Sequence, residues 1–67
     1  MTVEEIKAVL RRAVVYKIIR AWSRPAPNVW YIYFVTGCEQ KDDEFVEAYA
    51  KTLNELYELY DSSTPTS

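Results

Sequence analysis

Residues 28–37 read Asn-Val-Trp-Tyr-Ile-Tyr-Phe-Val-Thr-Gly, and every residue from Val29 to Val35 is aromatic or β-branched. Residues of these types favour the pleated, half-buried surface of a strand. The run is too short for a helix to be the better interpretation, and Asn28 and Gly37 bracket it with residues that are typical of turns. The sequence therefore predicts a strand here, with apolar side chains on both of its faces.

The whole chain has 67 residues, which predicts one small domain. A core of this size rarely supplies more than about 3–5 kcal/mol of stability unless a disulfide, a metal or a second subunit adds to it. Cys38 is the only cysteine and histidine is absent, which excludes an intrachain disulfide and disfavours a zinc site. Self-association remains open, so we expect a homodimer.

Apolar residues at helical spacing predict a first helix at the N-terminus, over residues 3–12. Thr2 and Glu5 match a capping box at its start. Residues 13–22 can be interpreted in two ways. They either continue this helix or form a strand that pairs with the strand at 29–36. In the first case the strand at 29–36 would have no partner, and its backbone N–H and C=O groups would lack hydrogen bonds. For this reason, and because the segment is rich in β-branched and aromatic residues, we favour the strand.

A six-residue connection, Ser-Arg-Pro-Ala-Pro-Asn at 23–28, separates the two predicted strands. Its prolines fix φ and remove backbone donors, so we expect a stiff, exposed loop. Pairing across this loop places Trp22 opposite Val29, although one bulge would exchange the two faces of the strand. In the predicted register, five side chains share the sheet face that points away from the helices: Tyr16, Arg20, Trp22, Tyr31 and Tyr33.

The segment from Gly37 to Lys41 is predicted to be a polar connection, after which Asp42 or Asp43 caps a second helix that extends to about Tyr60. The predicted fold is α+β with the order α-β-β-α, an antiparallel β-hairpin with both helices packed on one face. Residues 1–61 form the predicted domain, and residues 62–67 form a disordered polar tail.

Charge is unevenly distributed along the chain: residues 1–24 carry a net charge of +4, and residues 25–67 carry −6. Such asymmetry permits a basic surface for an acidic partner and the reverse. We expect the two halves to neutralise each other in the fold. The N-terminus does not resemble a signal peptide, and no apolar run is long enough to cross a membrane, which predicts a cytoplasmic protein without membrane contact.

Catalytic chemistry finds little support in this composition. The commonest general base, histidine, is missing, and Cys38 has no identifiable base of its own. Acidic residues at 39 and 42–44 lack the glycine and spacing of a calcium loop, and the single glycine excludes a glycine-rich phosphate loop. We therefore predict a protein that is not an enzyme, with no metal and no cofactor.

Binding is the function that this composition favours. Tyrosine, tryptophan and arginine are enriched at protein interfaces, so the face formed by Tyr16, Arg20, Trp22, Tyr31 and Tyr33 is predicted to bind a protein partner. The protein would act as an adaptor, regulator or inhibitor, including inhibitors of the kind that phages encode. The alternative is a single-stranded nucleic-acid-binding protein that stacks bases on the same aromatic rings. An enzyme that uses Cys38 is a third, weaker hypothesis.

Overall fold

The structure is a computed structural model that describes residues 1–63, with side chains as far as Asp61. Its elements follow the order α-β-β-β-α: α1 (Val3–Val15), β1 (Ala21–Ala26), β2 (Val29–Phe34), β3 (Gly37–Lys41) and α2 (Asp43–Ser63). The three strands form an antiparallel sheet in the order β1-β2-β3. The predicted α+β class is therefore confirmed, and the predicted α-β-β-α order is corrected by one additional strand.

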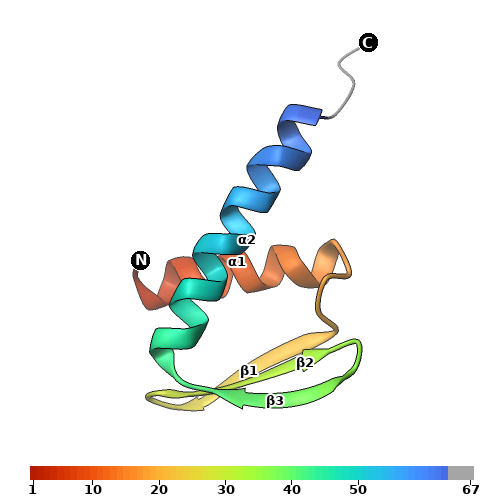
Figure 1. Cartoon of the computed structure of the whole chain (residues 1–67). Coiled ribbons are helices and arrows are strands. Elements are labelled where there is room, and N and C mark those ends of the chain that lie inside the picture. The colour runs from red at the N-terminus through yellow and green to blue at the C-terminus, as the bar shows by residue number, and fades with distance from the viewer. Residues whose placement is uncertain (64–67) are drawn as a thin grey trace.

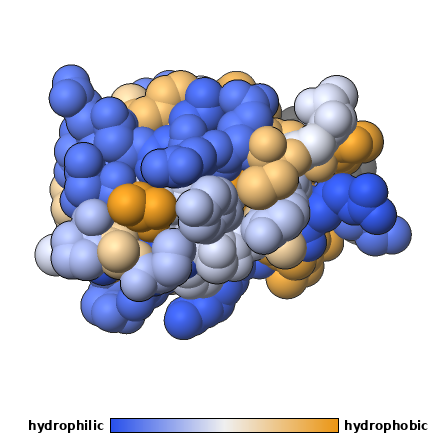
Figure 2. Space-filling model, turned by 90° about the horizontal axis from the view of Figure 1, so that it is seen from below, coloured by the Kyte–Doolittle hydropathy of each residue, from blue (hydrophilic) through white to orange (hydrophobic). Residues whose placement is uncertain are grey.

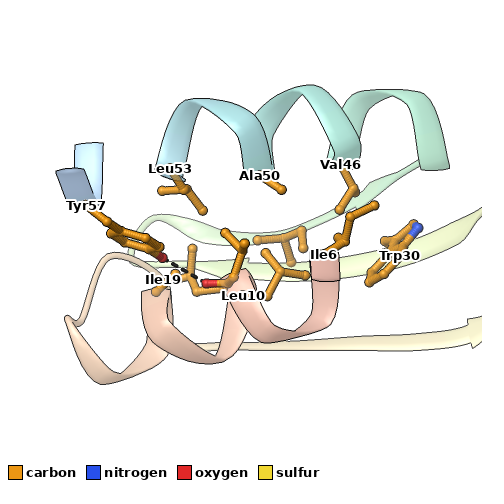
Figure 3. Close-up of a cluster of buried hydrophobic side chains, with 11 residues drawn as sticks. Ile6, Leu10, Ile19, Trp30, Val46, Ala50, Leu53 and Tyr57 are labelled. Atoms are coloured by element: carbon orange, nitrogen blue, oxygen red, sulfur yellow. Dashed lines mark hydrogen bonds between the residues drawn. The ribbon is translucent and has the colours of Figure 1, made fainter. Parts of the chain in front are cut away.

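Figure 1 shows both helices on the same side of the sheet, with the C-terminal half of α2 extending past α1. One cluster of buried side chains joins α1, α2 and β2, and Ile19 adds to it from the connection between α1 and β1. Trp30 lies at one end of this cluster and Tyr57 at the other (Figure 3). The central strand thus supplies the part of the core that the helices cover.

Helix α1 begins with the predicted capping box, in which the Thr2 hydroxyl accepts from the Glu5 backbone and the Glu5 carboxylate accepts from the Thr2 backbone. Neither interpretation of residues 13–22 is correct, because the helix ends at Val15 and β1 begins only at Ala21. Lys17 takes a positive φ of 63° just after the helix. The next backbone N–H, that of Ile18, donates to the Ala13 carbonyl at 2.8 Å, which is the bonding of a Schellman motif.

The predicted loop at 23–28 is mostly strand, because β1 runs through Pro25 to Ala26. β1 lies at the edge of the sheet and carries an irregularity after Ser23, and these are the places where a strand tolerates proline. Trp22 pairs with Ile32, not with Val29 as predicted. The pairing is shifted by three residues from the predicted register. Because successive side chains of a strand point to opposite faces, an odd shift moves Trp22 to the other face of the sheet.

Residues 37–41, predicted as a polar connection, form the third strand. Only Val35 and Thr36 separate β2 from β3, and Gly37 supports this tight reversal with a φ of +147° that side chains rarely adopt. Cys38 and Glu39 face solvent along an edge of the sheet. A strand of this polar composition is hard to detect in a sequence because edge strands bury little surface.

Helix α2 begins as predicted, with the Asp42 carboxylate accepting the backbone N–H of Phe45 at 2.8 Å. It continues through Ser63, so it includes residues 62 and 63 of the predicted tail. Residues 64–67, the remainder of that tail, lie outside the described residues.

Tyr57 provides a test of how α2 packs on α1. Its hydroxyl is buried and donates to the Val9 carbonyl at 2.8 Å, and burial raises its pKa to about 12. The Tyr57 hydroxyl ionises near pH 10 in the unfolded chain but only near pH 12 in the folded protein. Its contribution to the free energy of unfolding is therefore fully present below pH 10 and is lost as the pH rises towards 12. We expect a loss on the order of 2 kcal/mol in urea unfolding across this range. Tyr57→Phe should show a smaller loss, and an equal loss in both proteins would contradict the assignment.

Candidate functional site

Two of the five predicted binding residues lie where the sequence placed them. Tyr31 and Tyr33 alternate with the buried Trp30 and Ile32 along β2, so they occupy the sheet face that points away from the helices. Tyr33 is 42% exposed. Figure 2 shows mostly pale and blue residues across the middle of this face, which is therefore not a continuous apolar surface.

Trp22 and Tyr16 do not join this open face. Trp22 lies opposite Ile32 on the helix-covered side and packs against the core, with its ring centroid 6.1 Å from that of Trp30. Tyr16 caps the C-terminus of α1 and contacts the ring of Tyr57 edge-on at 5.2 Å. The structure thus distributes the five predicted residues over four locations, so the prediction that they share one sheet face is wrong.

The fourth location, around Arg20, borders two hollows in the surface. Arg20 lies at the start of β1, and its backbone N–H donates to the Tyr33 carbonyl at 2.6 Å. Two hollows meet there, of about 400 and 320 Å³, and both are lined by Arg20 and Val35. We call their combined surface the basic groove. The larger hollow is lined by Arg20, Ala21, Tyr33, Phe34, Val35, Thr36, Gly37 and Cys38, and the smaller by Val14, Lys17, Ile19, Arg20 and Val35.

The basic groove is positively charged because its two cations have no counter-ion among the described residues. Lys17 and Arg20 are both exposed, and neither forms an ion pair with any residue that the structure describes. No Asp or Glu lines either hollow. The sequence could have suggested this, since no acidic residue occurs between Glu5 and Glu39.

The expected neutralisation of the basic half by the acidic half is therefore limited. Among the residues with described side chains, one ion pair between side chains joins the two halves, from Arg24 to Asp43 at 3.9 Å. The remaining side-chain pairs, Lys7 with Glu4 and Lys41 with Glu39, lie within one half. The basic groove is a consequence of this incomplete pairing.

Arg24 and Asp43 also belong to a polar cluster that the sequence did not predict. The indole N–H of Trp30 donates to the Asp43 carboxylate at 2.6 Å, and the Arg24 guanidinium lies over the indole ring at 5.3 Å. The Asn28 side chain accepts the Asp43 backbone N–H at 3.0 Å. These contacts connect β1, β2 and the start of α2, so the cluster fixes the positions of these elements relative to one another.

Within the described part of the chain, no three His, Cys, Asp or Glu residues are grouped so that they could hold a metal ion. Neither α1 nor α2, as far as Ser63, is long and apolar enough to span a bilayer. Cys38 is exposed and reduced on β3, at one end of the basic groove.

Comparisons with protein-family models, with curated proteins and with solved structures find no match to this chain.

Proposed function

We propose that the chain is a small non-enzymatic interaction module that binds an acidic segment of another protein in the basic groove. The observation that carries this proposal is the position of Lys17 and Arg20 beside an apolar hollow lined by Val14, Ile19 and Val35. Both cations are exposed, and neither has an ion-pair partner in the part of the chain that the structure describes. Such a module would act as an adaptor, regulator or inhibitor.

The lining defines the chemistry of the partner. Val35 is 69% exposed and Ile19 is buried, so the smaller hollow has an apolar floor with an apolar rim. An aliphatic or aromatic side chain inserted there would remove apolar surface from water. Carboxylates on either side of it would pair with Lys17 and Arg20, and the arginine can accept a carboxylate in a bidentate geometry.

A protein partner fits this charge pattern better than single-stranded nucleic acid does. Nucleic-acid binding depends on several cations that neutralise consecutive phosphates, and the groove supplies two. The outer side of α2 carries Glu55 and Glu58, whose negative charge would repel a polyanion. Tyr31 and Tyr33, the rings best placed to stack bases, would instead extend the protein-binding surface onto the open sheet face.

The test begins with a peptide array of random sequences, probed with the labelled full-length protein. We expect enrichment of peptides in which an aliphatic or aromatic residue is flanked by Asp or Glu. The best peptide is then titrated by fluorescence anisotropy against the protein and against Arg20→Glu, which should bind at least about tenfold more weakly because a favourable pair becomes a repulsive one. Lys51→Glu on α2 is the matched control: it makes the same change of charge at an exposed site outside the groove.

Three results would contradict the proposal. The array could enrich peptides without acidic residues, or Arg20→Glu and Lys51→Glu could weaken binding equally. The third is salt-sensitive binding of a single-stranded oligothymidine, lost in Tyr31→Ala, which would make nucleic acid the primary partner.

A further inference from the structure

The two edges of the sheet differ in how well they could accept another strand. β1 contains Pro25, which has no backbone N–H, and its pairing with β2 is irregular between Ser23 and Ala26. β3 pairs regularly with β2 along all five of its residues. Proline and bulges are the features by which natural sheets block an edge, so β1 is blocked and β3 is the edge that can be extended.

The backbone of β3 presents its free hydrogen-bonding groups at two positions. The Tyr33 carbonyl accepts from Arg20 on the β1 side, so the backbone groups of Tyr33 point towards β1 and away from β3. In an antiparallel ladder these directions alternate along each strand. Cys38, which lies opposite Tyr33, and Gln40, two residues further on, therefore direct their N–H and C=O groups to the open edge.

The charges on β3 are complementary to those of a second, antiparallel copy. Glu39 and Lys41 lie on the helix-covered side, opposite Ile32 and Trp30, and pair with each other at 3.0 Å. If Gln40 faces Gln40 of a second copy across a two-fold axis, each Glu39 lies opposite Lys41 of the other copy. Glu39 of one copy and Lys41 of the other would then form a non-hydrogen-bonded pair. This is the type of cross-strand pair in which opposite side chains approach most closely.

Partly exposed aromatic side chains lie beside this edge on the helix-covered side. Phe34 contacts Tyr49 edge-on with ring centroids 5.9 Å apart, and Tyr49 stacks on Phe45 at 6.2 Å. Phe45 is 42% exposed and is linked to the edge by Lys41, whose ammonium lies 4.4 Å from the ring centroid. β3 offers these rings no apolar cover, since its residues on this face are Gly37, which has no side chain, and the charged Glu39 and Lys41.

We propose that β3 is a self-association surface, on which two copies of the chain pair antiparallel about a two-fold axis at Gln40 and form one continuous six-stranded sheet. Both copies then carry their helices on the same side of that sheet, so the aromatic side chains of α2 face their counterparts across the axis. The interface is isologous and closes as a dimer. β3 borders the basic groove through Gly37 and Cys38, but Glu39, Gln40 and Lys41, which form the centre of the pairing, line neither hollow. The association therefore goes beyond the proposed peptide binding and does not depend on it.

Charge exchange tests the register of the pairing. Sedimentation equilibrium of the full chain should give a dimer at micromolar concentrations, and Glu39→Lys or Lys41→Glu alone should weaken it by about tenfold because each puts like charges opposite each other twice. The double exchange, Glu39→Lys with Lys41→Glu, should restore the dimer. A monomeric wild type, or a double exchange no stronger than the single variants, would overturn the proposal.

A cysteine placed on the axis gives an independent readout. In a Cys38→Ser background, Gln40→Cys brings two thiols to directly opposite positions, about 5.5 Å apart between Cα atoms, which a disulfide can span. Mild oxidation should give a covalent dimer on a non-reducing gel. Glu58→Cys in the same background is the control and should run as a monomer on that gel, because its thiols lie away from the axis. Equal cross-linking of both variants would contradict pairing through β3.

The two proposals fail separately. Arg20→Glu should lose peptide binding and keep the dimer, whereas Lys41→Glu should weaken the dimer and keep peptide binding. Circular dichroism of each variant shows whether the fold is retained. A Lys41→Glu variant that keeps its spectrum and its dimer would refute the β3 interface without affecting the groove.

Discussion

Replacement of Trp30 by alanine is expected to unfold the domain at 25 °C. Trp30 is fully buried, and truncation of a buried tryptophan costs about 3–5 kcal/mol. That is comparable to the whole stability of a domain of this size, at most about 3–5 kcal/mol. The variant also removes the indole N–H that donates to Asp43, so the polar cluster loses the hydrogen bond that joins β2 to α2. Far-ultraviolet circular dichroism should show loss of helix.

Trp30→Phe separates the two contributions of this side chain. It keeps an aromatic ring in the core and loses the indole N–H, so it should be folded with a midpoint in urea below that of the wild type. Val35→Ala is the control for loss of a large apolar side chain at an exposed position, and should change stability by at most about 0.5 kcal/mol. A folded Trp30→Ala with wild-type stability would show that the core does not depend on this residue.

Tyr57→Ala is expected to have the second-largest effect, a loss of about 3 kcal/mol or more in urea unfolding. The Tyr57 ring is buried between the helices, and the Arg12 guanidinium lies over it at 4.5 Å. Truncation opens a cavity and leaves the Val9 carbonyl without the hydroxyl that donates to it. The extension of α2 past the sheet would then lose its principal attachment to α1.

Two variants on the same helix calibrate this value. Tyr57→Phe removes only the hydroxyl and should cost about 1 kcal/mol, the usual net contribution of a hydrogen bond. Leu59→Ala shortens a side chain that is 65% exposed and should cost at most about 0.5 kcal/mol. If Leu59→Ala destabilised as much as Tyr57→Ala, the exposed side of α2 would have to be buried in the assembled protein.

The candidate site was only partly predictable. Arg20 and Tyr33 were selected from the sequence, and the structure places both on the basic groove. The sequence does not place Lys17 beside Arg20, because its position near Val35 depends on the reversal that follows α1. Trp22 was assigned to the wrong face, since residue types do not reveal the bulge in β1 that fixes the register.

The sequence by itself determined the class of the fold, the central strand and both helix starts. These features depend on local chemistry: the period of apolar residues, the capping box at Thr2 and the aspartate at position 42. Tertiary structure alone decided where α1 ends and that residues 37–41 form a strand. Lys17 adopts a positive φ without being glycine, and β3 has polar residues that gain their pairing only from β2. Burial of Ile19 just after this turn and pairing of β3 with β2 both bring together residues that are distant in sequence, so no local pattern records them.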